Sequence, residues 1–178
     1  MSNADQQSSG GDDWLTEKNF DWAKYAAKRS NVEGASDFAN LIMDAYLEGR
    51  TLITNEAALS LIQAERTVIV ENWEKVVAAN VIHYANDVAE LINGGGTDFD
   101  CSTDSNCGKY WSEMAAFVLC LQYNSYSELT DHLNTWHGYT GQAPPAAGEG
   151  SSYLESLNSL MNEVGAGVGF TANQIAAF

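Results

Sequence analysis

The longest uninterrupted helical pattern in the chain runs from about Asn55 to Asn93. This segment contains neither proline nor glycine, and its apolar residues recur at the spacings that place them on one face of a helix. A helix of this length extends to about 60 Å. The segment therefore predicts one long helix, or two helices with a break near Arg66, against which shorter helices must pack.

Shorter segments with the same period lie on both sides of it. The expected helices cover about 14–30, 36–53, 108–123, 127–136 and a stretch from about 151 onward, with residues 171–178 as a last turn or a loose tail. Serine caps are expected at Ser36, at Ser127 and at either Ser151 or Ser152. Glycines are expected to end helices at Gly34, at 94–96 and at Gly165, Gly167 and Gly169.

The fold class follows from this pattern. No alternating strand pattern longer than about five residues is present. The sequence predicts an all-α fold, an antiparallel bundle of about five to seven helices. Residues 1–12 are expected to form a disordered leader whose first four residues resemble a vector scar, and residues 13–178 are expected to form a single helical-bundle domain.

Charge excludes some functions and leaves two alternatives. The chain has 24 acidic and 8 basic side chains, a formal net charge of −16, and no lysine or arginine after Lys109. Nucleic acid is excluded as a partner because no basic patch exists. No apolar run reaches the roughly 20 residues of a transmembrane helix. The acidic surface serves either solubility or the binding of cations.

The three cysteines fall into two environments. Cys101 and Cys107 lie in a polar loop, where a disulfide is expected, and such a bond requires an oxidising compartment. Cys120 lies in an apolar helical run. It is expected to be a small core residue rather than a nucleophile.

Three stretches carry a family pattern. They read WAKYAAKRSN with MDAYLEGRTLI, ENWEKVVAANVIHYAND, and KYWSEMAAFVLCLQYN. Together they resemble the C-terminal half of the DUF4856 family, which is similar to imelysin, over about Asp21 to Val164. The resemblance implies an exported, periplasmic or cell-envelope helical protein, a lipoprotein in the family context, with a link to iron uptake. The GxHxxE motif of imelysins is absent, because none of the three histidines is followed by Glu three residues later.

Two groups of residues are candidate metal ligands. His83 and Asp87 lie four apart on the long helix, and Glu113 lies on the apolar helix that follows. An imidazole and carboxylates in this arrangement suit a divalent cation. The alternatives are a core-edge histidine bonded to Asp87 or to a backbone carbonyl, and a salt bridge from Glu113 to an arginine.

The acidic loop offers the second group. Asp98, Asp100, Ser102 and Asp104 alternate as in a calcium loop, but the glycine and the final glutamate of an EF-hand are missing. The alternative is a solvated acidic loop. A further cluster, His132, Trp136, His137 and Tyr139, either lines a ligand groove or closes one end of the bundle.

These observations support three functional hypotheses. The first is a non-catalytic binding or interaction module of the cell envelope, linked to metal or iron acquisition through the resemblance. The second is an imelysin-like metal-dependent hydrolase. The third is a structural bundle that dimerises or pairs with a missing N-terminal half. The expected partners are a second copy, another protein or a metal ion, and the cofactor is unknown, with iron, zinc and calcium as the candidate cations.

Overall fold

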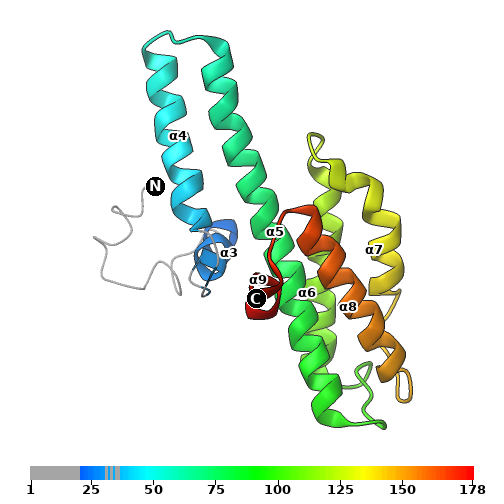
Figure 1. The fold of residues 1–178 in the computed structure, drawn as a ribbon. Helices are drawn as coiled ribbons and strands as arrows, with labels where there is room; N and C mark the ends of the chain where they lie inside the picture. Colours follow the sequence, from blue (N-terminus) through cyan, green and yellow to red (C-terminus); the bar gives the residue numbers. More distant parts are fainter. Residues whose placement is uncertain (1–20, 31, 33, 35–36) are drawn as a thin grey trace, which may run out of the picture. The chain divides into compact units, whose positions relative to one another are not determined.

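The computed structural model describes residues 21–30, 32, 34 and 37–178 of the chain (Figure 1). These residues form seven α-helices and two short 3-10 helices, and no strand occurs among them. The predicted all-α helical fold is confirmed. The expected leader over residues 1–12 and the expected helix start before Asp21 lie outside the described residues.

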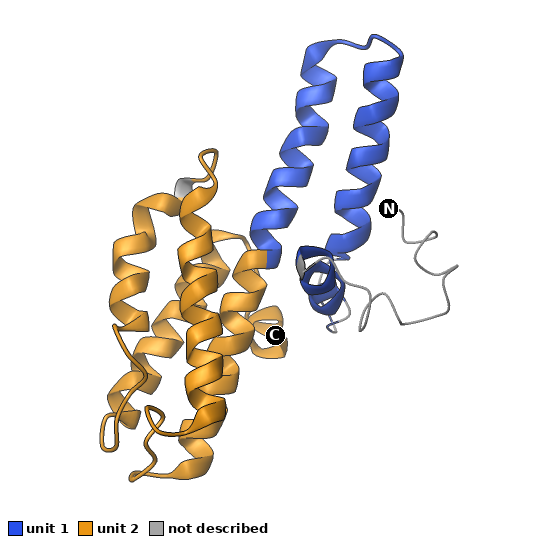
Figure 2. Cartoon of the chain, turned by 180° about the vertical axis from the view of Figure 1, so that it is seen from behind, with its two compact units in different colours: residues 1–76 blue, residues 77–178 orange. Residues whose placement is uncertain are grey.

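The chain divides into two compact units, residues 1–76 and residues 77–178 (Figure 2). Helix α5 (Leu59–Gly95) contributes to both. This helix is continuous through Arg66, so the alternative of a break there is wrong. Its interior holds no residue that interrupts the helical hydrogen-bond pattern. In the described part of the chain, none of the helices is both long and apolar enough to cross a membrane.

The first unit contains α3 (Asp21–Ser30), α4 (Phe38–Thr54) and the first part of α5. Its buried residues on α4 recur at spacings of four and three: Phe38, Ile42, Ala45 and Gly49. The start of α4 corrects the sequence analysis. Asp37 caps this helix by accepting a hydrogen bond from the amide of Asn40, whereas the expected cap, Ser36, lies outside the described residues.

The turn between α4 and α5 also differs from the prediction. Asn55, expected to open the long helix, is the C-terminal cap of α4, and α5 begins at Leu59. The physical reason is the backbone of Glu56, which has a φ of 53°. A left-handed residue cannot continue a right-handed helix, so the chain turns there.

The second unit contains the rest of α5 and six further elements. These are α6 (Ser105–Cys120), η1 (Leu121–Tyr123), η2 (Glu128–His132), α7 (Leu133–Thr140), α8 (Gly150–Gly167) and α9 (Ala172–Ala177). Helix α7, at the right edge of this unit in Figure 1, contacts both α6 and α8. The fully buried side chains that fill this unit include Val81, Ile82, Val88, Met114, Val118, Trp136, Leu157, Leu160 and Val164.

Two predictions about α8 are wrong. Neither Ser151 nor Ser152 caps it, because the helix begins at Gly150 and its N-cap position is Glu149. Gly165 lies inside the helix instead of ending it, whereas α8 does end at Gly167, and Gly169 follows with a φ of 78°. A Cβ atom at Gly165 would lie 2.4 Å from Cδ1 of Ile175. Gly165 therefore permits close packing, and no left-handed turn is needed there.

The C-terminal residues form a helix, so the alternative of a loose tail is wrong. Thr171 and Gln174 form a capping box at the start of α9. The side chain of each satisfies a backbone amide of the other, which is a common device for starting a short helix. Phe178 then buries its ring against Phe170.

The disulfide between Cys101 and Cys107 is present, as predicted, with 5.1 Å between the two Cα atoms. Cys120 is a free thiol and is half-buried at the last position of α6. Burial raises the pKa of this thiol. It therefore stays protonated at neutral pH, which agrees with a packing role and not with a nucleophilic one.

Candidate functional site

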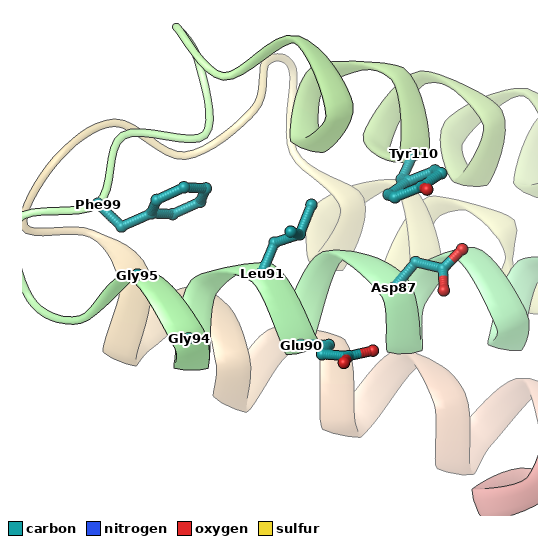
Figure 3. A pocket seen from close by; sticks show the side chains of 7 residues that line it. All are labelled: Asp87, Glu90, Leu91, Gly94, Gly95, Phe99 and Tyr110. Atoms are coloured by element: carbon teal, nitrogen blue, oxygen red, sulfur yellow. The ribbon is translucent and has the colours of Figure 1, made fainter.

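A pocket of about 540 Å³ lies beside the C-terminal end of α5 (Figure 3). Its floor is one stripe of α5, because Asp87, Glu90, Leu91 and Gly94 follow each other at helical spacings of three, one and three. The loop after α5 and the first turns of α6 supply the rest of the lining. We call this pocket the acidic-aromatic groove and define it by Asp87, Glu90, Leu91, Gly94, Gly95, Phe99 and Tyr110.

One aromatic wall of the groove depends on a glycine. The Phe99 ring lies against Gly95, and a Cβ atom at that glycine would sit 2.3 Å from Cδ2 of the ring. The amide of Phe99 donates a hydrogen bond to the carbonyl oxygen of Gly96, at 3.2 Å. Gly96, with a φ of 75°, lets the chain turn back, and Gly95 leaves the room that the Phe99 ring occupies over the end of α5.

Tyr110 on α6 forms the other aromatic wall. Its ring lies at 6.2 Å from the ring of Tyr84, which in turn stacks on Phe117 at 5.8 Å. The start of α6 is held by Asp104, whose carboxylate accepts hydrogen bonds from the amides of Asn106 and Cys107. The disulfide and this cap fix the loop that separates the two aromatic walls.

The electrostatic character of the groove is negative. Asp87 and Glu90 both line the groove. In Figure 3 the side chain of Asp87 extends toward Tyr110, whereas that of Glu90 lies at the opposite edge of the α5 ribbon. The helix ends beside them at Gly95. The carboxyl end of a helix carries a partial negative charge. Lys109 is exposed, and its Nζ lies 5.5 Å from the centroid of the Tyr110 ring.

Of the predicted metal ligands, Asp87 lies in the groove and His83 lies next to it. Nε2 of His83 is 3.5 Å from a carboxylate oxygen of Asp87, while Nδ1 is 2.6 Å from the carbonyl oxygen of Phe178. The histidine is thus bonded to a carboxylate and a backbone carbonyl, the arrangement expected of a core-edge residue. Glu113 is half-buried on α6 and is not part of the groove lining.

The carboxylates of the acidic loop serve local hydrogen bonds. Asp100 accepts from the amide and the hydroxyl of Ser102, and Asp104 caps α6. Asp98 does not line the groove. Within the ranges that the structure describes, no three or more His, Cys, Asp or Glu side chains group together so that they could hold a metal ion. Neither predicted metal site is therefore assembled in this structure.

The aromatic cluster on α7 packs between helices. Trp136 is buried and donates a hydrogen bond from Nε1 to Glu163 on α8, at 3.2 Å. Tyr139 donates to the other oxygen of the same carboxylate, at 2.8 Å. His132 stacks on Trp136, with 5.6 Å between the centroids. These contacts favour the structural alternative for the cluster over a ligand groove.

Residue patterns alone did not reveal the groove. The sequence predicts Asp87 as a metal ligand and the glycines as a helix end, and it predicts no site role for Glu90, Leu91, Phe99 or Tyr110. The one sequence feature that points to the groove is the placement of Asp87, Glu90, Leu91 and Gly94 on one face of the predicted helix. That spacing shows a shared face but does not show what covers it.

Known proteins offer no further guide. No family model, no curated protein and no solved structure matches this chain. The resemblance to the DUF4856 family stays a prediction.

Proposed function

We propose that this chain is a non-catalytic binding module and that the acidic-aromatic groove is its binding site. The observation that carries the proposal is the composition of the groove. It combines two carboxylates with a wall made of Leu91, Phe99 and Tyr110. A few polar groups on an apolar surface are typical of a small-ligand site.

The hydrolase alternative has less support. A metal-dependent hydrolase needs at least three protein ligands that converge on one ion. The described residues gather no such group. His83 is oriented by Phe178 and Asp87, and the raised pKa of Cys120 does not suit a nucleophile.

The proposal includes export to an oxidising compartment such as the cell envelope. The disulfide between Cys101 and Cys107 supports it, because structural disulfides persist in oxidising environments. The link to metal or iron acquisition enters the proposal through the family resemblance alone.

The test is a ligand titration followed through the backbone amides by NMR. The probes are small molecules of positive, negative and zero charge, and we expect one class to shift the amides of Gly94, Gly95 and Tyr110. The blocking variant is Gly94→Leu, since a Cβ atom at Gly94 meets no heavy atom within 4 Å. Gly138→Leu on α7 is the matched control, because its Cβ position is equally open.

Two results would overturn the proposal. One is the absence of amide shifts near the groove with every probe. The other is equal binding by the Gly94→Leu and wild-type proteins, because the added side chain occupies the groove.

A second candidate function, the structural bundle that pairs with another copy, is supported by exposed apolar side chains. Ile53, Leu59 and Leu61 are 62%, 66% and 52% exposed around the turn between α4 and α5. Clustered exposed apolar residues are typical of interaction surfaces. Sedimentation of the wild type and of Leu59→Ser tests it: a dimer that this substitution weakens supports pairing, and a monomer at all concentrations contradicts it.

A further inference from the structure

We infer that the acidic-aromatic groove takes an alkylammonium group, the chemistry of a lysine side chain or a linear amine. This inference rests on the proposed function and names its ligand class. It combines three properties of the groove: two carboxylates, an apolar wall and an aromatic face.

The charge around the groove selects a cation. Asp87 and Glu90 lie three residues apart on α5, and the negative end of that helix adjoins them. Among residues 77–178, Lys109 is the single lysine or arginine in the sequence. An anion would therefore meet repulsion throughout this unit, whereas a cation gains from both carboxylates.

The apolar wall favours an organic cation over a metal ion. Calcium and magnesium need six or more oxygen ligands in most protein sites, and the groove lining offers two carboxylates. Leu91 and Phe99 instead present hydrocarbon surface. An alkyl chain can lie on that surface while its ammonium group remains near the carboxylates.

The chain itself shows an ammonium group near an aromatic wall. Nζ of Lys109 lies 5.5 Å from the centroid of the Tyr110 ring, within the usual range of a cation–π contact. The electron-rich face of this tyrosine is thus accessible to an ammonium group. A ligand amine would compete with Lys109 for the ring and would be repelled by its charge.

The experiment compares three molecules with the same five-carbon chain. Cadaverine carries two ammonium groups, pentanediol is neutral and glutarate carries two carboxylates. We expect only cadaverine to shift the amides of Gly94, Gly95 and Tyr110, and we expect a higher salt concentration to weaken its binding. A capped trilysine peptide, run in parallel, distinguishes a protein lysine from a free amine by its relative affinity.

Charge variants locate the binding. Asp87→Asn and Glu90→Gln should each weaken cadaverine binding by about 2- to 5-fold, and Tyr110→Leu should weaken it by about 2- to 5-fold. Lys109→Gln should tighten it by about 2-fold, since it removes a competing cation. Glu155→Gln is the matched control, because Glu155 is exposed on α8 outside the groove.

The outcomes separate this inference from the proposed function. Binding of pentanediol or glutarate at the groove, without cadaverine, overturns the inference and leaves the binding module intact. The inference is also overturned if Glu155→Gln and Glu90→Gln weaken cadaverine binding equally, because the net charge of the protein alone then attracts the amine. If none of the probes shifts the groove amides, both the inference and the proposed function fail.

Discussion

The imidazole of His83 lies 2.6 Å, through Nδ1, from the carbonyl oxygen of Phe178, although 95 residues separate them in the chain. A second contact runs parallel to it, because the side-chain amide of Asn86 donates to the carbonyl oxygen of Ile175 at 3.2 Å. The side chain of Ile175 meanwhile lies over Gly165 on α8. Helix α9 is therefore held by polar contacts to α5 and by an apolar contact to α8.

Removing one of these polar contacts should loosen α9 without unfolding the unit. In His83→Ala or Asn86→Ala, loss of a hydrogen bond worth about 0.5–1.5 kcal/mol should speed hydrogen exchange in α9 by roughly 2- to 10-fold. The exchange rates of the Ile175 and Phe178 amides measure this change, since these amides donate hydrogen bonds to the carbonyl oxygens of Thr171 and Gln174. Asn158→Ala on the exposed face of α8 is the control, and unchanged exchange in both test variants would contradict this account.

Alanine should have opposite effects at two adjacent glycines. Gly95→Ala places a methyl group against the ring of Phe99, and such overpacking typically costs about 1–3 kcal/mol. A Cβ atom at Gly94 meets no heavy atom within 4 Å, so Gly94→Ala should stabilise α5 by up to about 1 kcal/mol through the higher helix propensity of alanine. Urea denaturation measures both free energies of unfolding. A stabilising Gly95→Ala would show that Phe99 does not need this close approach.

Reduction of the disulfide should destabilise the protein moderately. Cys101 and Cys107 are six residues apart, and the chain-entropy relation gives about 2–3 kcal/mol for so short a loop. The Cys101→Ser, Cys107→Ser double variant should show the same loss in denaturation, and reductant should not affect it further. Alkylation under denaturing conditions should label one thiol, Cys120, before reduction and three after it; three labelled thiols before reduction would contradict the bond.

The hydrogen bond from Tyr139 to Glu163 should be sensitive to alkaline pH. The pKa of Tyr139 is raised, first by this hydrogen bond and then by burial and the nearby carboxylate charge. Because the folded pKa exceeds the unfolded value of about 10, the bond's contribution to stability is complete below that pH and is lost as the pH rises through the folded pKa.

Substitution of the carboxylate checks this prediction. Glu163→Ala should return the pKa of Tyr139 toward its usual range, as followed by the ring carbon shifts in NMR. Glu155→Ala, on the same helix but exposed, is the matched control and should leave the pKa of Tyr139 unchanged. An unaltered pKa in Glu163→Ala would assign the shift to burial instead.

Local patterns predicted the features that depend on neighbours in sequence. The helical period and the absence of proline and glycine between Asn55 and Asn93 predicted the helical fold and most of α5. The loop that holds Cys101 and Cys107 predicted the disulfide. Ser127 caps a helix as expected, because its hydroxyl accepts from the amide of Leu129.

Features that depend on distant residues were not predictable in this way. Gly165 looks like a helix end in the sequence, but Ile175 packs against it and α8 continues to Gly167. The groove likewise depends on Phe99 folding back onto Gly95. A single sequence shows neither the partner that covers a glycine nor the direction in which a loop returns.

The position of Lys109 gives the second unit a single natural labelling point. Its amine is the one lysine amine of residues 77–178 and is exposed beside Tyr110. Within residues 77–178, an amine-reactive dye therefore attaches to a single side chain, which lies next to the groove. Trypsin cleaves after an unmodified lysine but not after a labelled one, so unlabelled protein should release residues 110–178 as one peptide and protein labelled at Lys109 should release residues 76–178, which mass spectrometry distinguishes.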